Sequence, residues 1–155
     1  MTFKPFGETQ FYEDFAVGDR FRTDAVSFAE PMIIAFAREY DPQGFHTDPA
    51  YAAKTIYGGI IASGWQVAAL TFRKLIDAGF LRGGGMGSPG LDEVRWYKPV
   101  RPGDDIRLEL TVTSTRLSNT RSDRGYVNLD IDAFNQKGER VMSYKVMEVL
   151  RRRDA

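Results

Sequence analysis

An aspartate and the only histidine of the chain, Asp41 and His46, lie five residues apart in a segment rich in turn-forming residues. Carboxylate and imidazole groups often transfer protons in reactions near neutral pH. Pro42 and Gly44 stand between them and disfavour helical geometry. We therefore expect a bent loop that can turn both side chains toward one cavity. The alternative is a surface histidine beside acidic residues that end a helix.

The backbone amide of Gly64 is a second candidate group. Glycine inside an otherwise strong helix costs about 1 kcal/mol relative to alanine, so a close approach should compensate for it. The approaching group is either another helix or a ligand carbonyl that accepts a hydrogen bond. Amides of a first helical turn lack internal acceptors, and the helix dipole favours negative charge there. Gly64 can act in this way only if the regular helix begins near it, with residues 58–63 as an irregular approach.

A helix is expected directly before Asp41. Residues 30–40 carry one apolar stripe at helical spacing. Ser27 and Glu30 have the spacing of a capping box, which predicts the start of this helix. The proline that follows Asp41 ends it, because a residue before proline disfavours helical geometry.

Two further helices are expected after His46. Asp48 and Pro49 have the types of an N-cap and a first helical residue, which predicts a short helix over residues 49–54. In residues 59–78, the part up to Phe72 is apolar on nearly every side of a helix. Gly79 follows this segment and is a residue typical of a helix C-terminus. These residues predict one long helix enclosed by the fold.

The rest of the chain predicts sheet. Apolar and polar residues alternate in the second half, which gives each strand one dry and one wet face. The glycine-rich residues 82–90 predict a flexible loop, and residues 135–138 have the types of a hairpin turn. The expected strands are residues 20–28, 91–98, 106–113, 127–133 and 140–150. This order predicts an α+β domain whose antiparallel sheet wraps over one helix.

Length and charge limit the classes of protein. The 155 residues fit one domain over 1–155, with residues 151–155 as a basic tail. The 21 Lys and Arg residues balance 21 Asp and Glu residues, and no dense basic stripe is present. Nucleic acid and anionic membranes are therefore not expected as partners.

The residue types also limit the chemistry. The chain has no cysteine and one histidine, so disulfides, thiolate nucleophiles and Cys-rich or His-rich metal sites are excluded. We expect no metal and no cofactor. The apolar residues 60–72 are too short to cross a bilayer, and the first residues lack the pattern of a secretory signal. We expect a cytoplasmic protein.

The motifs around these groups resemble the MaoC-like dehydratases, relatives of the R-specific enoyl-CoA hydratases. The resemblance is carried by the Asp41 and His46 spacing, by His46-Thr-Asp-Pro-Ala-Tyr-Ala-Ala and by Gly59-Ile-Ile-Ala-Ser-Gly-Trp before an apolar helix. It extends to residues 12–19 and 95–104 and so covers most of the chain. It implies a hot-dog fold, in which a curved antiparallel sheet cradles a long central helix and dimers pair two sheets.

The resemblance also implies a reaction. The protein would be a hydro-lyase of fatty acid metabolism, adding water reversibly to the double bond of a 2-enoyl thioester on CoA or an acyl carrier. Asp41 and His46 would hold the water as the catalytic pair, with Asp41 activating it and His46 positioning it and sharing the proton. That division stays open because an interacting pair titrates as a unit. The Gly64 amide would bind the thioester oxygen, and Ser63 is grouped with it as a substrate-binding residue.

Two departures from the family pattern bear on the substrate. Many R-specific hydratases carry Asp-x-Asn-Pro-x-His, whereas here residues 42–45 are Pro-Gln-Gly-Phe at the same spacing. A serine that some relatives place eight residues after the glycine falls on Phe72. The second departure predicts a different or shorter acyl pocket.

Three other functions stay open. A hot-dog thioesterase generally uses a carboxylate near the start of the central helix, but residues 58–71 contain no Asp or Glu. Ser63 as a nucleophile would need glycines at the positions of Ile61 and Trp65, so a packing or capping role fits it better. The third alternative is an acyl-thioester binding module without catalysis.

Overall fold

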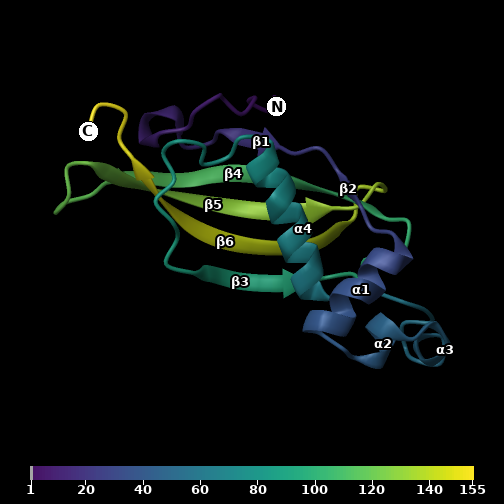
Figure 1. Ribbon diagram of the computed structural model, residues 1–155. Helices are drawn as coiled ribbons and strands as arrows, with labels where there is room; N and C mark the ends of the chain where they lie inside the picture. The colour runs from purple at the N-terminus through teal and green to yellow at the C-terminus, as the bar shows by residue number, and fades with distance from the viewer. Residues whose placement is uncertain (1) are drawn as a thin grey trace.

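The chain folds around a curved antiparallel sheet, seen in a computed structural model that describes residues 2–155 (Figure 1). Its strands are β1 (Arg20–Arg22), β2 (Val26–Ser27), β3 (Leu91–Trp96), β4 (Asp105–Leu117), β5 (Arg124–Phe134) and β6 (Arg140–Arg151). The strand order is β1-β4-β5-β6-β3, and β2 also pairs with β4. The predicted strand at residues 20–28 is thus split in two, and β3 ends two residues earlier than expected.

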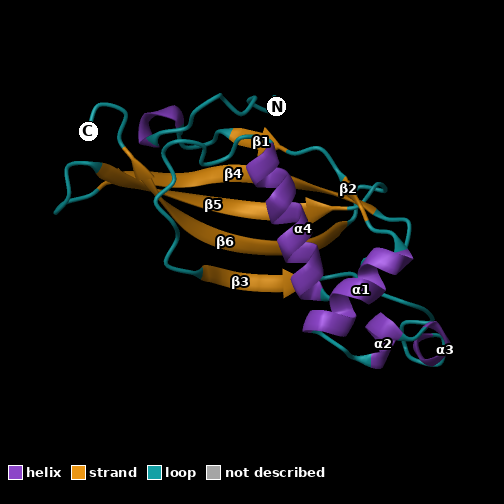
Figure 2. Cartoon of the chain, in the orientation of Figure 1, coloured by secondary structure: helices purple, strands orange, loops and turns teal. Residues whose placement is uncertain are grey.

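The helices lie on one face and at one end of this sheet (Figure 2). They are the short 3-10 turn η1 (Tyr12–Asp14), α1 (Glu30–Tyr40), α2 (Gly44–Thr47), α3 (Pro49–Ala52) and α4 (Gly64–Asp77). α4 crosses the face of the sheet, while α1, α2 and α3 gather beside its first turn. The predicted α+β architecture is confirmed. Among residues 2–155, none of the helices combines the length and the apolarity that a membrane span requires.

The core lies between α4 and the sheet. The predicted alternation is confirmed, because the inward residues of β4 and β5 are buried along both strands. These residues are Ile106, Leu108, Leu110, Val112, Val127, Leu129, Ile131 and Ala133. The expectation that α4 is enclosed on all sides is wrong. The sheet covers one face of the helix, and Trp65, Phe72 and Ile76 on the rest of it are exposed.

The predicted helix before Asp41 is confirmed at residues 30–40, but its predicted cap is wrong. The N-cap is Ala29, and no side chain caps the helix. The hydroxyl of Ser27 instead donates to the carboxylate of Asp105. The two residues face each other because β2 pairs with β4 at this register.

The long helix begins at Gly64 rather than at residue 59. Residues 60–62 are buried, but they belong to no helix or strand. Their amides bond to other parts of the chain, from Ile61 to the carbonyl of Phe45 at 3.2 Å and from Ala62 to that of Val100 at 2.8 Å. A short apolar run cannot be told from a helix by its pattern alone. The condition for Gly64 to lie in a first helical turn is therefore met.

The glycine-rich loop, which was predicted to be flexible, and the basic tail are both held by contacts. The glycine-rich residues 82–90 lie against β6, where the amide of Met86 donates to the carbonyl of Val149 at 2.8 Å. In the basic tail, Nε of Arg152 pairs with Glu13 of η1 at 3.1 Å. The basic tail is thereby held against η1.

Candidate active site

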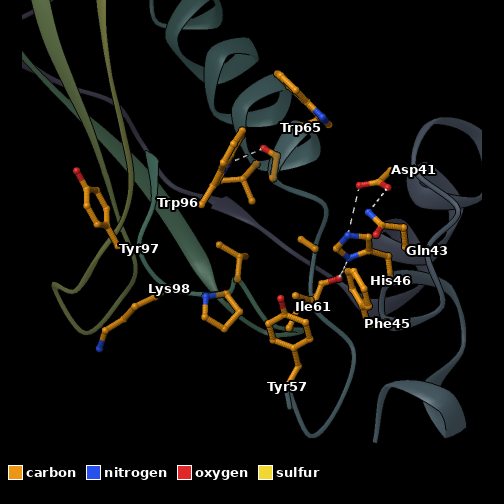
Figure 3. Close-up of a pocket in the computed structure, with 15 residues that line it drawn as sticks. Asp41, Gln43, Phe45, His46, Tyr57, Ile61, Trp65, Trp96, Tyr97 and Lys98 are labelled. Carbon is orange, nitrogen blue, oxygen red and sulfur yellow. Dashed lines mark hydrogen bonds and ion pairs between the residues drawn. The ribbon is translucent and has the colours of Figure 1, made fainter. Parts of the chain in front are cut away.

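Asp41 and His46 come together at the end of α1 (Figure 3). Asp41 is the C-cap of α1, and His46 lies on the single turn α2. Nε2 of His46 is 3.3 Å from Oδ2 of Asp41. The histidine is 4% exposed, so the surface alternative is wrong. The predicted bent loop is also corrected, because residues 44–47 form a helical turn directly after the bend.

The imidazole of His46 is held in one orientation. Its Nδ1 lies 2.7 Å from the carbonyl oxygen of Ile61. A carbonyl can only accept, so Nδ1 carries the hydrogen in this bond. The phenyl ring of Phe45 packs edge-on against the imidazole at 4.5 Å between centroids. In the neutral ring, Nε2 therefore presents a lone pair toward Asp41.

The carboxylate of Asp41 is fixed by two further donors. The hydroxyl of Ser63 donates to Oδ2 at 2.7 Å, and Nε2 of Gln43 donates to Oδ1 at 2.8 Å. Burial by itself raises the pKa of Asp41, but these two hydrogen bonds and the charge of His46 outweigh it, and the pKa lies below its usual value. Asp41 is thus held as a carboxylate, the form that can accept a proton.

Ser63 has a different place from the one predicted. Its side chain is fully buried and its hydroxyl is directed at Asp41. It does not line the cavity described below. A nucleophilic serine would instead face the imidazole of His46. Ser63 therefore orients the carboxylate, and neither a direct substrate contact nor a nucleophilic role fits its position.

Gly64 is the first residue of α4, a helix of 14 residues. Among residues 2–155, no acceptor pairs with its amide, which leaves this donor open at the positive end of the helix dipole. A Cβ added at Gly64 would lie 2.5 Å from Cε2 of Trp96. Nε1 of the same indole donates to the Gly64 carbonyl at 3.1 Å. The close approach predicted for this glycine is present, but it is made by an indole from β3 and not by another helix.

These groups open onto one cavity of about 390 Å³. Asp41, His46 and Gly64 all line it. Figure 3 shows Asp41 and His46 side by side, and Gly64 is the first residue of α4. The other lining residues are Gln43, Phe45, Tyr57, Ile61, Ala62, Trp65, Val67, Trp96, Tyr97, Lys98, Pro99 and Val100. Within the described part of the chain, no three His, Asp or Glu side chains gather as candidate metal ligands.

Sequence reasoning missed Gln43 and Trp96 as parts of this site. Gln43 follows Asp41 by two residues and lies in the segment where the sequence differs from the family pattern. That difference could have pointed to a role for Gln43 in the site. Trp96 lies in one of the resembling segments, residues 95–104, but its contact with Gly64 joins residues far apart in the chain.

Comparisons with known proteins agree with this geometry. The model of the MaoC like domain family matches residues 13–131. The crystal structure of a MaoC-like dehydratase from Rhodospirillum rubrum is 41% identical, with a TM-score of 0.87 over 93% of this chain and 98% of that one. R-hydratase PhaJ1 from Pseudomonas aeruginosa is 30% identical, with a TM-score of 0.73 over 92% of this chain and 85% of its own. The uncharacterized protein YdeM of Bacillus subtilis is 29% identical over 90% of this chain and 98% of its length.

Proposed function

Because the chain belongs to the MaoC-like dehydratase family, with the hot-dog fold of its hydratase neighbours, we propose that it reversibly adds water to the double bond of a 2-enoyl thioester. One observation carries this proposal. Asp41, His46 and the open amide of Gly64 line the same cavity. A carboxylate and an imidazole supply proton transfer, and the amide supplies a donor for the oxygen on which charge develops.

The Asp41–His46 pair suits the binding of one water molecule. Nε2 of His46 lies 3.3 Å from Oδ2 of Asp41, and when the imidazole is neutral both atoms are acceptors. A water beside them can donate one hydrogen to each, which turns its oxygen lone pair away from the pair and into the cavity. The β-carbon of an enoyl group in the cavity then meets that lone pair.

The protons and electron pairs of the proposed hydration can be followed step by step. As the water oxygen bonds to the β-carbon, the electrons of the double bond move to the thioester oxygen and form an enolate. The Gly64 amide donates to this oxygen, with the helix dipole of α4 adding to the stabilisation. The pair takes one proton from the water and returns one to the α-carbon. Dehydration is the reverse of these steps.

Asp41 and His46 share the proton that is taken from the water. Asp41 activates the water, and His46 positions it and shares the transfer. Acid–base catalysis of this kind contributes about 10²–10⁴-fold, and one oxyanion donor about 10²–10³-fold. Both effects are needed, so loss of either one should remove most of the activity.

The test is hydration of crotonyl-CoA, followed by loss of absorbance of the conjugated thioester. We expect Asp41→Asn and His46→Ala each to lower kcat by about 10²-fold or more. Asp77→Asn, on the exposed end of α4, is the matched control and should keep wild-type activity. Wild-type rates in both site variants would contradict the proposal.

The same samples separate the alternatives. Release of free thiol from acyl-CoA would support a thioesterase, although the cavity offers Asp41 and no carboxylate from α4. Calorimetric binding of an acyl-CoA without turnover of any enoyl ester would support a binding module.

We further propose that the protein forms a homodimer in the cytoplasm through β3. This strand is an edge of the sheet, so its outer backbone groups are free to pair with a second copy. Its apolar side chains Leu91 and Trp96 are exposed. Exposed apolar surface around a free edge is typical of an interface between copies.

A further inference from the structure

A second cavity begins where the candidate active site ends. It has a volume of about 460 Å³ and is lined by residues of α4, of the sheet and of the segment that leads from α4 to β3. Trp65 lines both cavities. Ala68, Ala69 and Phe72 continue the wall, and at helical spacing these residues share one face of α4. We call this second cavity the α4 groove.

The α4 groove is apolar except at one place. Its walls are formed by Trp65, Ala68, Ala69, Phe72, Phe80, Leu81, Gly87, Ser88, Leu91, Ile131, Tyr144, Val146 and Glu148. Ser88 already donates to the carbonyl of Gly90. Among the described residues lining the groove, Tyr144 and Glu148 of β6 are the only titratable ones.

Glu148 has no structural partner to explain its burial. It is 5% exposed on the inward face of β6, where its neighbour across the ladder is Val127 and its neighbours along the strand are Val146 and Leu150. Within residues 2–155, its carboxyl group makes no hydrogen bond or ion pair. Tyr144 is 6% exposed, and its hydroxyl is also without a hydrogen bond in the described chain. Among residues 2–155, the side-chain polar atom that is both fully buried and unpartnered is Oε1 of Gln66, so the polar atoms of Glu148 and Tyr144 still reach the groove. Both groups are thus free to form hydrogen bonds with a ligand in the groove.

We infer that Glu148, with Tyr144, recognises a hydrogen-bonding group on the acyl chain of the substrate, and that this substrate is an enoyl thioester carrying a hydroxyl. The inference rests on the proposed function. A thioester oxygen on the Gly64 amide directs the acyl chain past Trp65 into the α4 groove. Phe72 lies eight residues after Gly64, which is about 12 Å along the helix axis, so the hydroxyl belongs on a medium-length chain rather than on a crotonyl group.

The properties of the two groups select a neutral hydroxyl. Burial raises the pKa of Glu148 to about 7, so near neutral pH the group is present in both its acid and carboxylate forms. The carboxylate accepts a hydrogen bond, and the Tyr144 phenol donates one; a hydroxyl can satisfy both. A second carboxylate would meet like charge. An ammonium group would lose its hydration in an apolar groove, which costs more than burying a hydroxyl.

The test compares pairs of trans-2-enoyl-CoA esters of increasing chain length, each with and without a terminal hydroxyl. For a medium-length pair, we expect wild-type kcat/KM to favour the hydroxylated ester by about tenfold or more. Glu148→Leu should reverse this preference, and Glu148→Gln should keep part of it. Glu8→Leu, exposed and outside both cavities, should leave the ratio as in wild type.

Each ratio is measured within one variant, so a lower yield or stability of that variant does not affect it. Equal ratios in wild type and Glu148→Leu would overturn the inference, as would a wild-type preference for the plain ester. Turnover of crotonyl-CoA by wild type tests the proposed function separately. If no ester is turned over, calorimetry with saturated acyl-CoA and its hydroxylated counterpart decides whether the α4 groove prefers the hydroxyl. Equal affinities of wild type for the two would also overturn the inference.

Discussion

The hydroxyl of Ser63 donates a 2.7 Å hydrogen bond to Asp41, on the carboxylate oxygen that also faces His46. This bond is one of the contacts that hold the pKa of Asp41 below its usual value against the effect of burial. Ser63, the residue before the open amide of Gly64, thus helps to keep the carboxylate ionised. The start of α4 serves the proton-transfer pair and the oxyanion donor together.

Ser63→Ala should move the pH dependence of the reaction. Without this donor the pKa of Asp41 rises, so the acidic limb of kcat/KM should shift to higher pH. The measurement is the pH profile for enoyl-CoA hydration, with the exposed Ser122→Ala as a control. An acidic limb at the wild-type position would show that Ser63 does not tune Asp41.

Gly64→Ala should disturb Trp96. The new Cβ would lie 2.5 Å from Cε2 of the indole, so the ring must move and the helix start with it. We expect a loss of about 1–3 kcal/mol in the free energy of unfolding. Combining Gly64→Ala with Trp96→Ala removes the clash, so the double variant should be less destabilised than the sum of the two single variants. Additive effects in denaturant unfolding would contradict this contact.

Glu148→Gln should change how stability depends on pH. The folded-state pKa of Glu148 is about 7 against an ordinary value of 4.5, so the folded chain binds the extra proton between these values. Wild-type stability should therefore fall as pH rises through this window, by about 3 kcal/mol relative to Glu148→Gln. Below about pH 4.5 the difference between the two proteins should stay constant. Glu8→Gln is the control, and parallel stability curves for wild type and Glu148→Gln would contradict the burial of this carboxyl.

Leu91→Lys should weaken self-association. Leu91 is an exposed apolar residue at the start of the free edge β3. A lysine at a sheet edge opposes pairing with another strand. Sedimentation velocity should show a wild-type dimer and a larger fraction of monomer for the variant. Leu117→Lys, equally apolar and exposed at the far end of β4, should stay dimeric; a monomeric wild type would rule out the proposed interface.

Local patterns predicted much of the fold. The alternation on β4 and β5, the helix at residues 30–40 and the N-cap at Asp48 follow from neighbouring residues, and each is confirmed. The cap at Ser27 was wrong because β4 lies close enough to bring Asp105 to its hydroxyl. A capping box was available by spacing, but tertiary pairing provided another partner.

The residues proposed to take part in the reaction could be predicted from the sequence, but the residues that hold them in place could not. The resemblance named Asp41, His46 and Gly64, and the structure brings them to one cavity. The contacts of Ser63 and Trp96 depend on how α4 meets α1 and β3, which no local pattern reports. The irregular path of residues 60–62 was likewise not predicted, because a short buried apolar segment has the same pattern whether it is helical or not.

The most direct test of the central claim is a crystal structure with a bound 3-hydroxyacyl-CoA. The product hydroxyl occupies the place of the added water, and the thioester oxygen marks that of the enolate. We predict the hydroxyl within hydrogen-bond distance of both Oδ2 of Asp41 and Nε2 of His46, and the thioester oxygen on the amide of Gly64. A hydroxyl that contacts neither side chain, or a thioester oxygen turned away from Gly64, would contradict the account.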